Sequence, residues 1–267
     1  MSFKLAIVGK GGVGKTFLAG TLARLFAKDG KNVLAIDADP NLNLHATLGG
    51  ISKTKMKNLT PIREMKDLIE ERTGVPAGTS GMFVLNPKVD DIPDKYHVKS
   101  EDGVKLIVLG TIKTAGGGCI CPESALLRAL LSHIILHRDE VVIIDFYAGL
   151  EHLGRGTSKG VDAMIIVVEP GTRSLDLAKR INSLAASLGV PRRYIVGNRI
   201  SNKQEEEFLL NSSKELELEL LGLIPYDTEV IQSDIKGIAP IDFAPECPAL
   251  VVIQNIKEIL EKKLASQ

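Results

Sequence analysis

Short apolar runs alternate with longer amphipathic stretches along most of the 267-residue chain. Continuous apolar runs are typical of strands buried on both faces, and apolar positions three or four residues apart are typical of helices. The predicted strands are 5–8, 32–37, 82–85, 96–98, 104–109, 141–145, 163–168, 194–198 and 220–225. The predicted helices are 17–28, 61–72, 122–138, 174–188, 203–213 and 248–264.

This alternation predicts parallel βαβ units with right-handed crossovers. Because no composition break marks a linker and no segment repeats, we expect a single α/β domain over residues 1–267. Its sheet should be mostly parallel, with helices on both faces. Residues 101–103, Glu-Asp-Gly, predict a hairpin between two short strands. Residues 43–56 have no clear pattern, and residues 87–94 are predicted to form a loop.

Composition narrows the classes of partner. The chain is 44% hydrophobic but only 4% aromatic and has no tryptophan, so its core should be aliphatic. A formal net charge of zero gives no support for a nucleic-acid partner. No stretch approaches the roughly 20 apolar residues of a membrane span. A strand close to the N-terminus leaves no room for a signal peptide, and only three cysteines are present, so we expect a cytoplasmic protein.

The loop between the first predicted strand and helix, residues 9–16, reads G-K-G-G-V-G-K-T and matches the P-loop pattern. Glycines let backbone N–H groups surround phosphate oxygens, and the helix N-terminus favours anions. Lys15 is expected to reach the β- and γ-phosphates of ATP, and the Thr16 hydroxyl to hold Mg²⁺. The alternative is an ordinary glycine-rich turn. The predicted contacts to ATP or ADP are Gly11, Gly12, Val13, Gly14, Lys15, Thr16 and Phe17.

Other polar residues fall at the carboxyl ends of predicted strands, where ligands bind in open parallel sheets. Asp145 follows an apolar run and is expected to hold Mg²⁺ through water as a Walker B carboxylate; the alternative is a helix cap. Asp37 ends the second strand and is expected to support Mg²⁺ indirectly. Asn198 has a side-chain amide suited to recognising adenine, although a turn residue is the simpler interpretation.

A second lysine in the loop, Lys10, resembles the deviant Walker A motif of the MinD/ParA and nitrogenase-iron-protein class of NTPases. In that class this lysine crosses a dimer interface to the partner's nucleotide, which implies a nucleotide-dependent homodimer; otherwise Lys10 is a surface residue. The resemblance also implies that Asp39 orients the attacking water and that Pro225 and Asp227 line the base. The expected catalytic residues are therefore Lys10, Lys15 and Asp39. For Asp39, the alternative is a turn carboxylate.

Two cysteines, Cys119 and Cys121, follow three glycines and precede a predicted helix. In an extended C-x-C segment both sulfurs point to one side, and a two-fold dimer would bring four together. Four thiolates suit tetrahedral Zn²⁺, whereas Ni²⁺ prefers a square-planar set. The alternative is two buried, inert cysteines. Cys247 is expected to be structural, and His133 and His137, which lack the zincin glutamate, to be packing or surface residues.

Taken together, these features resemble the CooC-type ATPases that mature nickel enzymes. The matching segments are 10–16, 37–41, 119–121 and, most specifically, 148–157. The resemblance implies an ATP-dependent homodimer with a Ni²⁺ or Zn²⁺ site between its subunits, which assists nickel insertion into carbon monoxide dehydrogenase or acetyl-CoA synthase. Phe146 and Tyr147 depart from the pattern, because an acidic residue is expected before the Ala148-Gly149 pair.

Two other functions stay open. An electron-transfer reductase of the nitrogenase-iron-protein type would hold a [4Fe–4S] cluster through one cysteine from each of two loops, but His152 lies near the place of the second. A MinD/ParA-type positioning ATPase would bind a membrane through a terminal amphipathic helix, or DNA through a basic surface. The apolar stripe at 250–264 is wide and is more typical of a helix packed on the sheet, so we expect no membrane partner.

Overall fold

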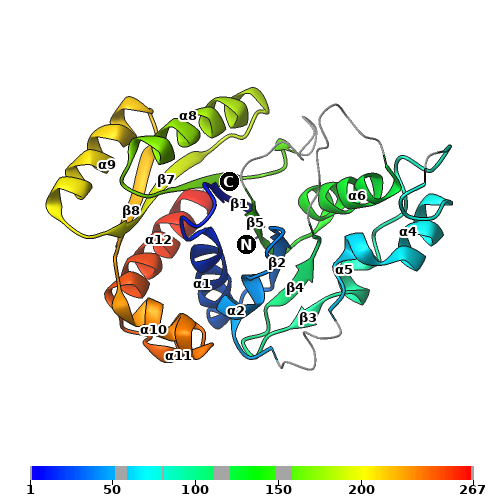
Figure 1. Ribbon diagram of the computed structural model, residues 1–267, viewed down its shortest axis with the longest axis horizontal. Coiled ribbons are helices and arrows are strands. Elements are labelled where there is room, and N and C mark those ends of the chain that lie inside the picture. Colours follow the sequence, from blue (N-terminus) through cyan, green and yellow to red (C-terminus); the bar gives the residue numbers. More distant parts are fainter. Residues whose placement is uncertain (1, 52–58, 80, 111–120, 148–157, 266–267) are drawn as a thin grey trace.

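The computed structural model describes residues 2–51, 59–79, 81–110, 121–147 and 158–265. Its eight strands form one sheet in the order β3-β4-β2-β5-β1-β6-β7-β8 (Figure 1). The strands are β1 (Phe3–Gly9), β2 (Val33–Ala38), β3 (Val98–Lys99), β4 (Lys105–Val108), β5 (Val141–Phe146), β6 (Ala163–Val168), β7 (Arg193–Ile200) and β8 (Glu219–Pro225). Only β3 and β4 pair antiparallel, and the other pairs are parallel. The predicted α/β class and the hairpin at 101–103 are confirmed.

The helices cover both faces of the sheet. They are α1 (Lys15–Lys28), α2 (Leu44–Leu48), the 3₁₀ helix η1 (Ile62–Glu64), α4 (Lys66–Thr73), α5 (Ile92–Lys95), α6 (Pro122–His137), α8 (Thr172–Ser187), α9 (Lys203–Glu215), α10 (Thr228–Lys236), α11 (Pro240–Phe243) and α12 (Pro248–Leu264). In Figure 1, α8 and α9 lie on one side of β7 and β8, and α12 lies on the other. Helices α6 and α4 lie together at the end of the molecule opposite α9.

Two aliphatic cores explain why the strands read as unbroken apolar runs. Successive side chains of a strand point to opposite faces. In β1, Ala6 and Val8 therefore join the core under α6 and α8, whereas Leu5 and Ile7 join the core under α1 and α12. Because both faces of the central strands are buried, no polar alternation remains in their sequences.

Two predictions near α4 were wrong. The helix expected at 61–72 is divided, because Met65, with φ −78° and ψ 80°, leaves the helical conformation between the 3₁₀ helix η1 and α4. The strand expected at 82–85 is irregular chain, and its apolar side chains do not reach the sheet, since Met82 is 98% exposed.

Four short helices, α2, α5, α10 and α11, are additions to the predicted elements. Helix α5 lies partly within the loop expected at 87–94. Helix α10 has caps at both ends: Asp227 accepts a hydrogen bond from the Glu229 N–H at 2.9 Å, and Gly237 follows with a φ of 64°. Both cap signals are visible in the sequence, so α10 is a helix that the apolar pattern alone misses.

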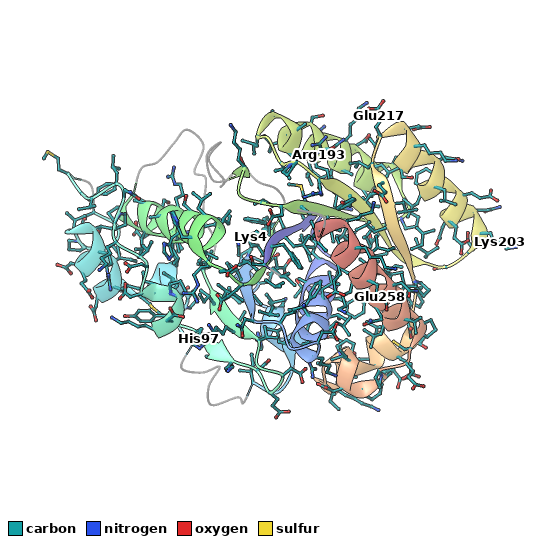
Figure 2. All side chains as sticks on the ribbon, turned by 180° about the vertical axis from the view of Figure 1, so that it is seen from behind. Lys4, His97, Arg193, Lys203, Glu217 and Glu258 are labelled. Carbon is teal, nitrogen blue, oxygen red and sulfur yellow. The ribbon has the colours of Figure 1, made fainter. Side chains whose placement is uncertain are left out.

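The strand order places β1 near the middle of the sheet. Seen from behind, Lys4 of β1 lies between His97, beside edge strand β3, and Lys203, at the start of α9 (Figure 2). The P-loop therefore starts from one of the most deeply buried strands, where neighbouring strand ends converge.

No helix within the described ranges is both long and apolar enough to span a bilayer.

Candidate nucleotide site

The loop from β1 to α1 depends on glycine. Gly12 and Gly14 have φ values of 80° and 95°, which L side chains rarely adopt. A Cβ atom on Gly14 would also lie 2.1 Å from Nδ2 of Asn198. Gly11 and Gly12 are exposed to solvent, whereas Val13 is completely buried and anchors the loop in the core. The exposed backbone between these anchors is placed to receive phosphate groups.

The two lysines of the loop differ in environment. Lys15 is only 4% exposed, and its Nζ donates to the Lys10 carbonyl at 3.1 Å. Burial lowers the pKa of Lys15, although the nearby charges of Asp145 and Asp39 act in the opposite direction. The side chain of Lys10, in contrast, is exposed. Lys15 is thus a poorly solvated cation held inside the loop, and Lys10 is accessible to a second molecule.

A threonine and a carboxylate meet beneath the loop. Thr16 Oγ1 donates to Oδ2 of Asp145 at 2.6 Å. Asp145 is completely buried, and its Oδ1 has no hydrogen-bond partner among the described residues. Burial raises the pKa of Asp145 to about 7. A buried carboxylate oxygen without a partner, beside a hydroxyl, fits Mg²⁺, which prefers oxygen ligands and takes few from the protein.

Asp37 and Asp39 organise the turn after β2. Asp37 is paired in register with Asp145, and its two oxygens accept from the backbone N–H groups of Asp39 and Leu44 at 3.1 and 3.0 Å. Burial raises its pKa to about 6. Asp39 accepts from the backbone and side-chain N–H groups of Asn41 at 2.8 and 2.9 Å. Asp37 therefore holds the turn beside Asp145, and Asp39 has the bonds of a turn carboxylate close to Lys15.

A cavity of about 540 Å³ lies next to the loop, a size that suits a small ligand or cofactor. Its lining includes five of the predicted nucleotide contacts, Gly14 and Phe17 of the P-loop segment and the predicted base contacts Asn198, Pro225 and Asp227. It also includes residues from the unpredicted α10–α11 region, among them Tyr226, Ile231, Ile238 and Pro240. These residues make one wall of the cavity apolar, and the caps of α10 are the sequence signal that could have located them.

Two polar residues of the cavity are already used by the fold. Asn198 Nδ2 donates to the Val13 carbonyl at 2.8 Å and so joins β7 to the P-loop. Its amide oxygen and second N–H are what it can offer a base. Asp227 accepts from the N–H groups of Glu229 and Ala249 at 2.9 and 3.1 Å, which caps α10 and ties it to α12. Asp227 therefore shapes the wall and has no oxygen without a partner.

The two residues after Asp145 differ in their exposure to solvent. Phe146 is completely buried in the core under α6, whereas Tyr147 is 48% exposed. Phe146 thus fills core volume, and Tyr147 stands directly before the Ala-Gly pair, where the resemblance would lead one to expect an acidic residue.

Of the cysteine pair, only Cys121 lies within the described residues. Cys119 and the segment 148–157 lie outside them. Cys121 precedes α6 in an extended conformation, with φ −113° and ψ 155°, and its thiol donates to Ser124 Oγ at 3.1 Å. Cys247 is buried, and burial raises the pKa of its thiol. Within the described ranges, no three His, Cys, Asp or Glu side chains are grouped to hold a metal ion. The metal site therefore stays a prediction from sequence.

A P-loop on a parallel sheet, a buried cation, a Thr16–Asp145 pair and an adjoining cavity define a P-loop nucleotide hydrolase. Comparison with known proteins agrees. Residues 5–241 match the model of the CobQ/CobB/MinD/ParA nucleotide binding domain. The chain belongs to this family and is a CooC-type ATPase.

Individual relatives support this assignment. The chain is 43% identical over 244 residues to the carbon monoxide dehydrogenase accessory protein CooC of Rhodospirillum rubrum, with 91% of each chain covered. It is 48% identical over 235 residues to an uncharacterised ATP-binding protein of Methanocaldococcus jannaschii, which covers 88% of this chain and 89% of the relative. A chain of the MinC:MinD cell division protein complex of Aquifex aeolicus shares the fold, with a TM-score of 0.70, 24% identity and 98% and 96% coverage.

Proposed function

We propose that this ATPase assists nickel insertion into a client enzyme, carbon monoxide dehydrogenase or acetyl-CoA synthase, as a nucleotide-gated homodimer. The observation that supports the proposal is 43% identity with a carbon monoxide dehydrogenase accessory protein over 91% of both chains. The similarity extends over most of both chains and is therefore not confined to the P-loop.

The proposed roles follow from the geometry of the site. Lys15 and the N–H groups of the loop bind the β- and γ-phosphates, because Lys15 is buried where its charge is poorly solvated. Thr16 and Asp145 would hold Mg²⁺, which neutralises phosphate charge when it is bound, and Asp37 supports them by fixing the adjacent turn. Asp39 orients the attacking water.

Lys10 provides the link between subunits. Its carbonyl is bound by Lys15, which fixes the backbone, while its side chain extends into solvent. In a face-to-face dimer this cation would reach the phosphates bound by the partner, so the dimer would be tightest with ATP in both sites. The positive charge adds stabilisation in the transition state, as arginine fingers do in related hydrolases.

The cargo site would form between the same two subunits. One Cys119 and one Cys121 from each subunit give four thiolates on the two-fold axis. The extended backbone at Cys121 agrees with a C-x-C segment whose sulfurs point to one side. Binding and hydrolysis of ATP would then change the spacing of the four thiolates and so hold or release Ni²⁺.

Metal analysis combined with mass determination tests this proposal. We expect Cys119→Ala and Cys121→Ala to lose stoichiometric Ni²⁺ or Zn²⁺ while they still bind ATP, and the wild-type protein to shift from monomer to dimer mass with ATP. Cys247→Ala removes a buried cysteine elsewhere and is the matched control. Unchanged metal content in both variants would contradict the proposal.

A client assay separates the metal site from its purpose. Purified nickel-free carbon monoxide dehydrogenase is incubated with Ni²⁺, ATP and this protein, and activity is measured against the Cys121→Ala variant. Activation that requires both ATP and Cys121 supports insertion. Visible absorbance of an iron–sulfur cluster in anaerobically prepared protein would instead indicate the electron-transfer alternative.

A further inference from the structure

Two histidines face each other near the end of α6, away from the nucleotide site. His133 and His137 are four residues apart and therefore lie on one face of the helix. Their ring centroids are 5.4 Å apart with an interplanar angle of 39°. His133 is half-buried and His137 is exposed, so the pair is open to solvent on one side.

This spacing suits a metal chelate. Two histidines at i and i+4 of a helix hold Zn²⁺ in the H-E-x-x-H metalloproteases. Two rings that each place a nitrogen about 2.0–2.1 Å from one metal ion, at 90–110° to each other, have centroids roughly 5 Å apart. The observed separation is close to that value, so small rotations of the rings would bring both nitrogens onto one ion.

The charges around the pair act in both directions. Burial lowers the pKa of His133, and His137 and Arg138 lower it further, while Asp90 and Asp94 act in the opposite direction. A neutral imidazole with an available lone pair is the ligand that metals require. The charge of Arg138 is paired with Asp94 and Glu140 at 2.8 and 2.9 Å. The C-terminal end of a helix dipole attracts positive charge as well.

We propose that His133 and His137 form a two-imidazole site for a divalent transition metal ion such as Ni²⁺ or Zn²⁺. Twelve residues of helix separate His133 from Cys121, about 18 Å at 1.5 Å per residue, so this site is distinct from the cysteine pair. In the described part of the chain no third His, Cys, Asp or Glu side chain completes the set, and water fills the other positions. Ile134 stands where a zincin has its glutamate, so the site binds metal without hydrolytic chemistry.

Ni²⁺ titration of the nucleotide-free full-length chain tests the site, with Cys119→Ala and Cys121→Ala combined to remove the cysteine pair. The isotherm should show one Ni²⁺ per chain. Adding His133→Ala or His137→Ala should weaken binding at least about tenfold, because loss of a second-shell partner alone weakens metal sites 10–100-fold. His97→Ala is the control. His97, labelled in Figure 2, lies outside α6, directly before β3, and its Nδ1 bonds the Pro93 carbonyl at 3.0 Å.

Paramagnetic Ni²⁺ provides a second measurement that does not depend on protein stability. The ring proton signals of His133 and His137 should broaden before those of His45 and His97. Equal broadening of all histidine signals, or isotherms unchanged by both alanine substitutions, would overturn the proposal. Because the cysteines are absent from these proteins, its failure would leave the cysteine site and the proposed function untouched.

Discussion

At its phosphate end, the nucleotide site consists of buried charged groups hydrogen-bonded to the P-loop, whereas its base end is a more exposed cavity whose lining is mostly apolar. Lys15, which is part of the P-loop, is 4% exposed, and its Nζ donates to the Lys10 carbonyl. Asp145 is 0% exposed and accepts a hydrogen bond from Thr16 of the loop. The cavity wall instead carries half-exposed side chains such as Tyr226, at 52%, and Ile238, at 43%.

The difference shows where the fold fixes geometry before ATP arrives. Burial has already removed water from Lys15 and Asp145, so the cost of desolvation is met during folding. The base end owes its shape to Asn198 and Asp227, whose polar atoms hold backbone groups. Phosphate-end substitutions should therefore act on catalysis, and base-end substitutions on stability and ATP affinity.

The sharpest test of this division is Lys15→Ala. Removal of the buried cation should lower ATPase kcat by about 10²–10³-fold, the usual effect of losing one group that stabilises transition-state charge. The fold should persist, because burial of the charged lysine opposes folding. Lys28→Ala, an exposed lysine in the last turn of α1, is the control. Equal rates in the two variants would remove the basis for the comparison.

The next test uses pH on nucleotide-free protein in EDTA. Burial raises the pKa of Asp145 from its ordinary 3.8 to about 7, so the folded state binds more protons than the unfolded state between these values. Its contribution to stability is present below about pH 4 and is lost as the pH rises to about 7. Asp145→Asn should therefore be more stable than wild type at pH 8, by up to a few kcal/mol at about 1.4 kcal/mol per pKa unit.

Urea unfolding of both proteins from pH 4 to pH 8 measures this difference. It should shrink as the pH falls, and Asp37, which titrates in the same range, is present in both proteins. A difference that does not change with pH would mean that the Asp145 charge is well solvated, contrary to its burial.

The local geometry of the P-loop is easier to predict from the sequence than the shape of the cavity, and the reason is physical. Gly14, Lys15 and Thr16 act through local backbone geometry, which a short motif specifies. The Asn198–Val13 hydrogen bond joins residues that are 185 positions apart, and no local sequence pattern at either residue predicts it. The strands were predictable because burial on both faces leaves unbroken apolar runs. The helix expected at 61–72 was only partly predictable, since the chain leaves the helical conformation at Met65.

A base-end substitution of intermediate effect is Asn198→Ala. It leaves the buried Val13 carbonyl without its side-chain donor, which should lower the free energy of unfolding by about 1–3 kcal/mol. The KM for ATP should rise more than kcat falls, because the loop that holds the phosphates is less firmly placed. Asn198→Asp removes the donor at nearly constant volume but sets a buried carboxylate against the Val13 carbonyl, so it should lower the free energy of unfolding further than Asn198→Ala. A change in kcat alone would contradict the division between the two ends.

The smallest effect is expected at Asp227, and a second helix cap supplies its control. Asp227→Ala removes the cap of α10, and Asn202→Ala removes the cap of α9, where Asn202 accepts from the Glu205 N–H at 3.0 Å. Each should lower the free energy of unfolding by about 1 kcal/mol. Only Asp227 lines the cavity, so only its loss should raise the KM for ATP, with kcat unchanged. If both variants raise KM equally, general loosening of the fold explains the effect, and the cavity wall has no specific part in holding the base.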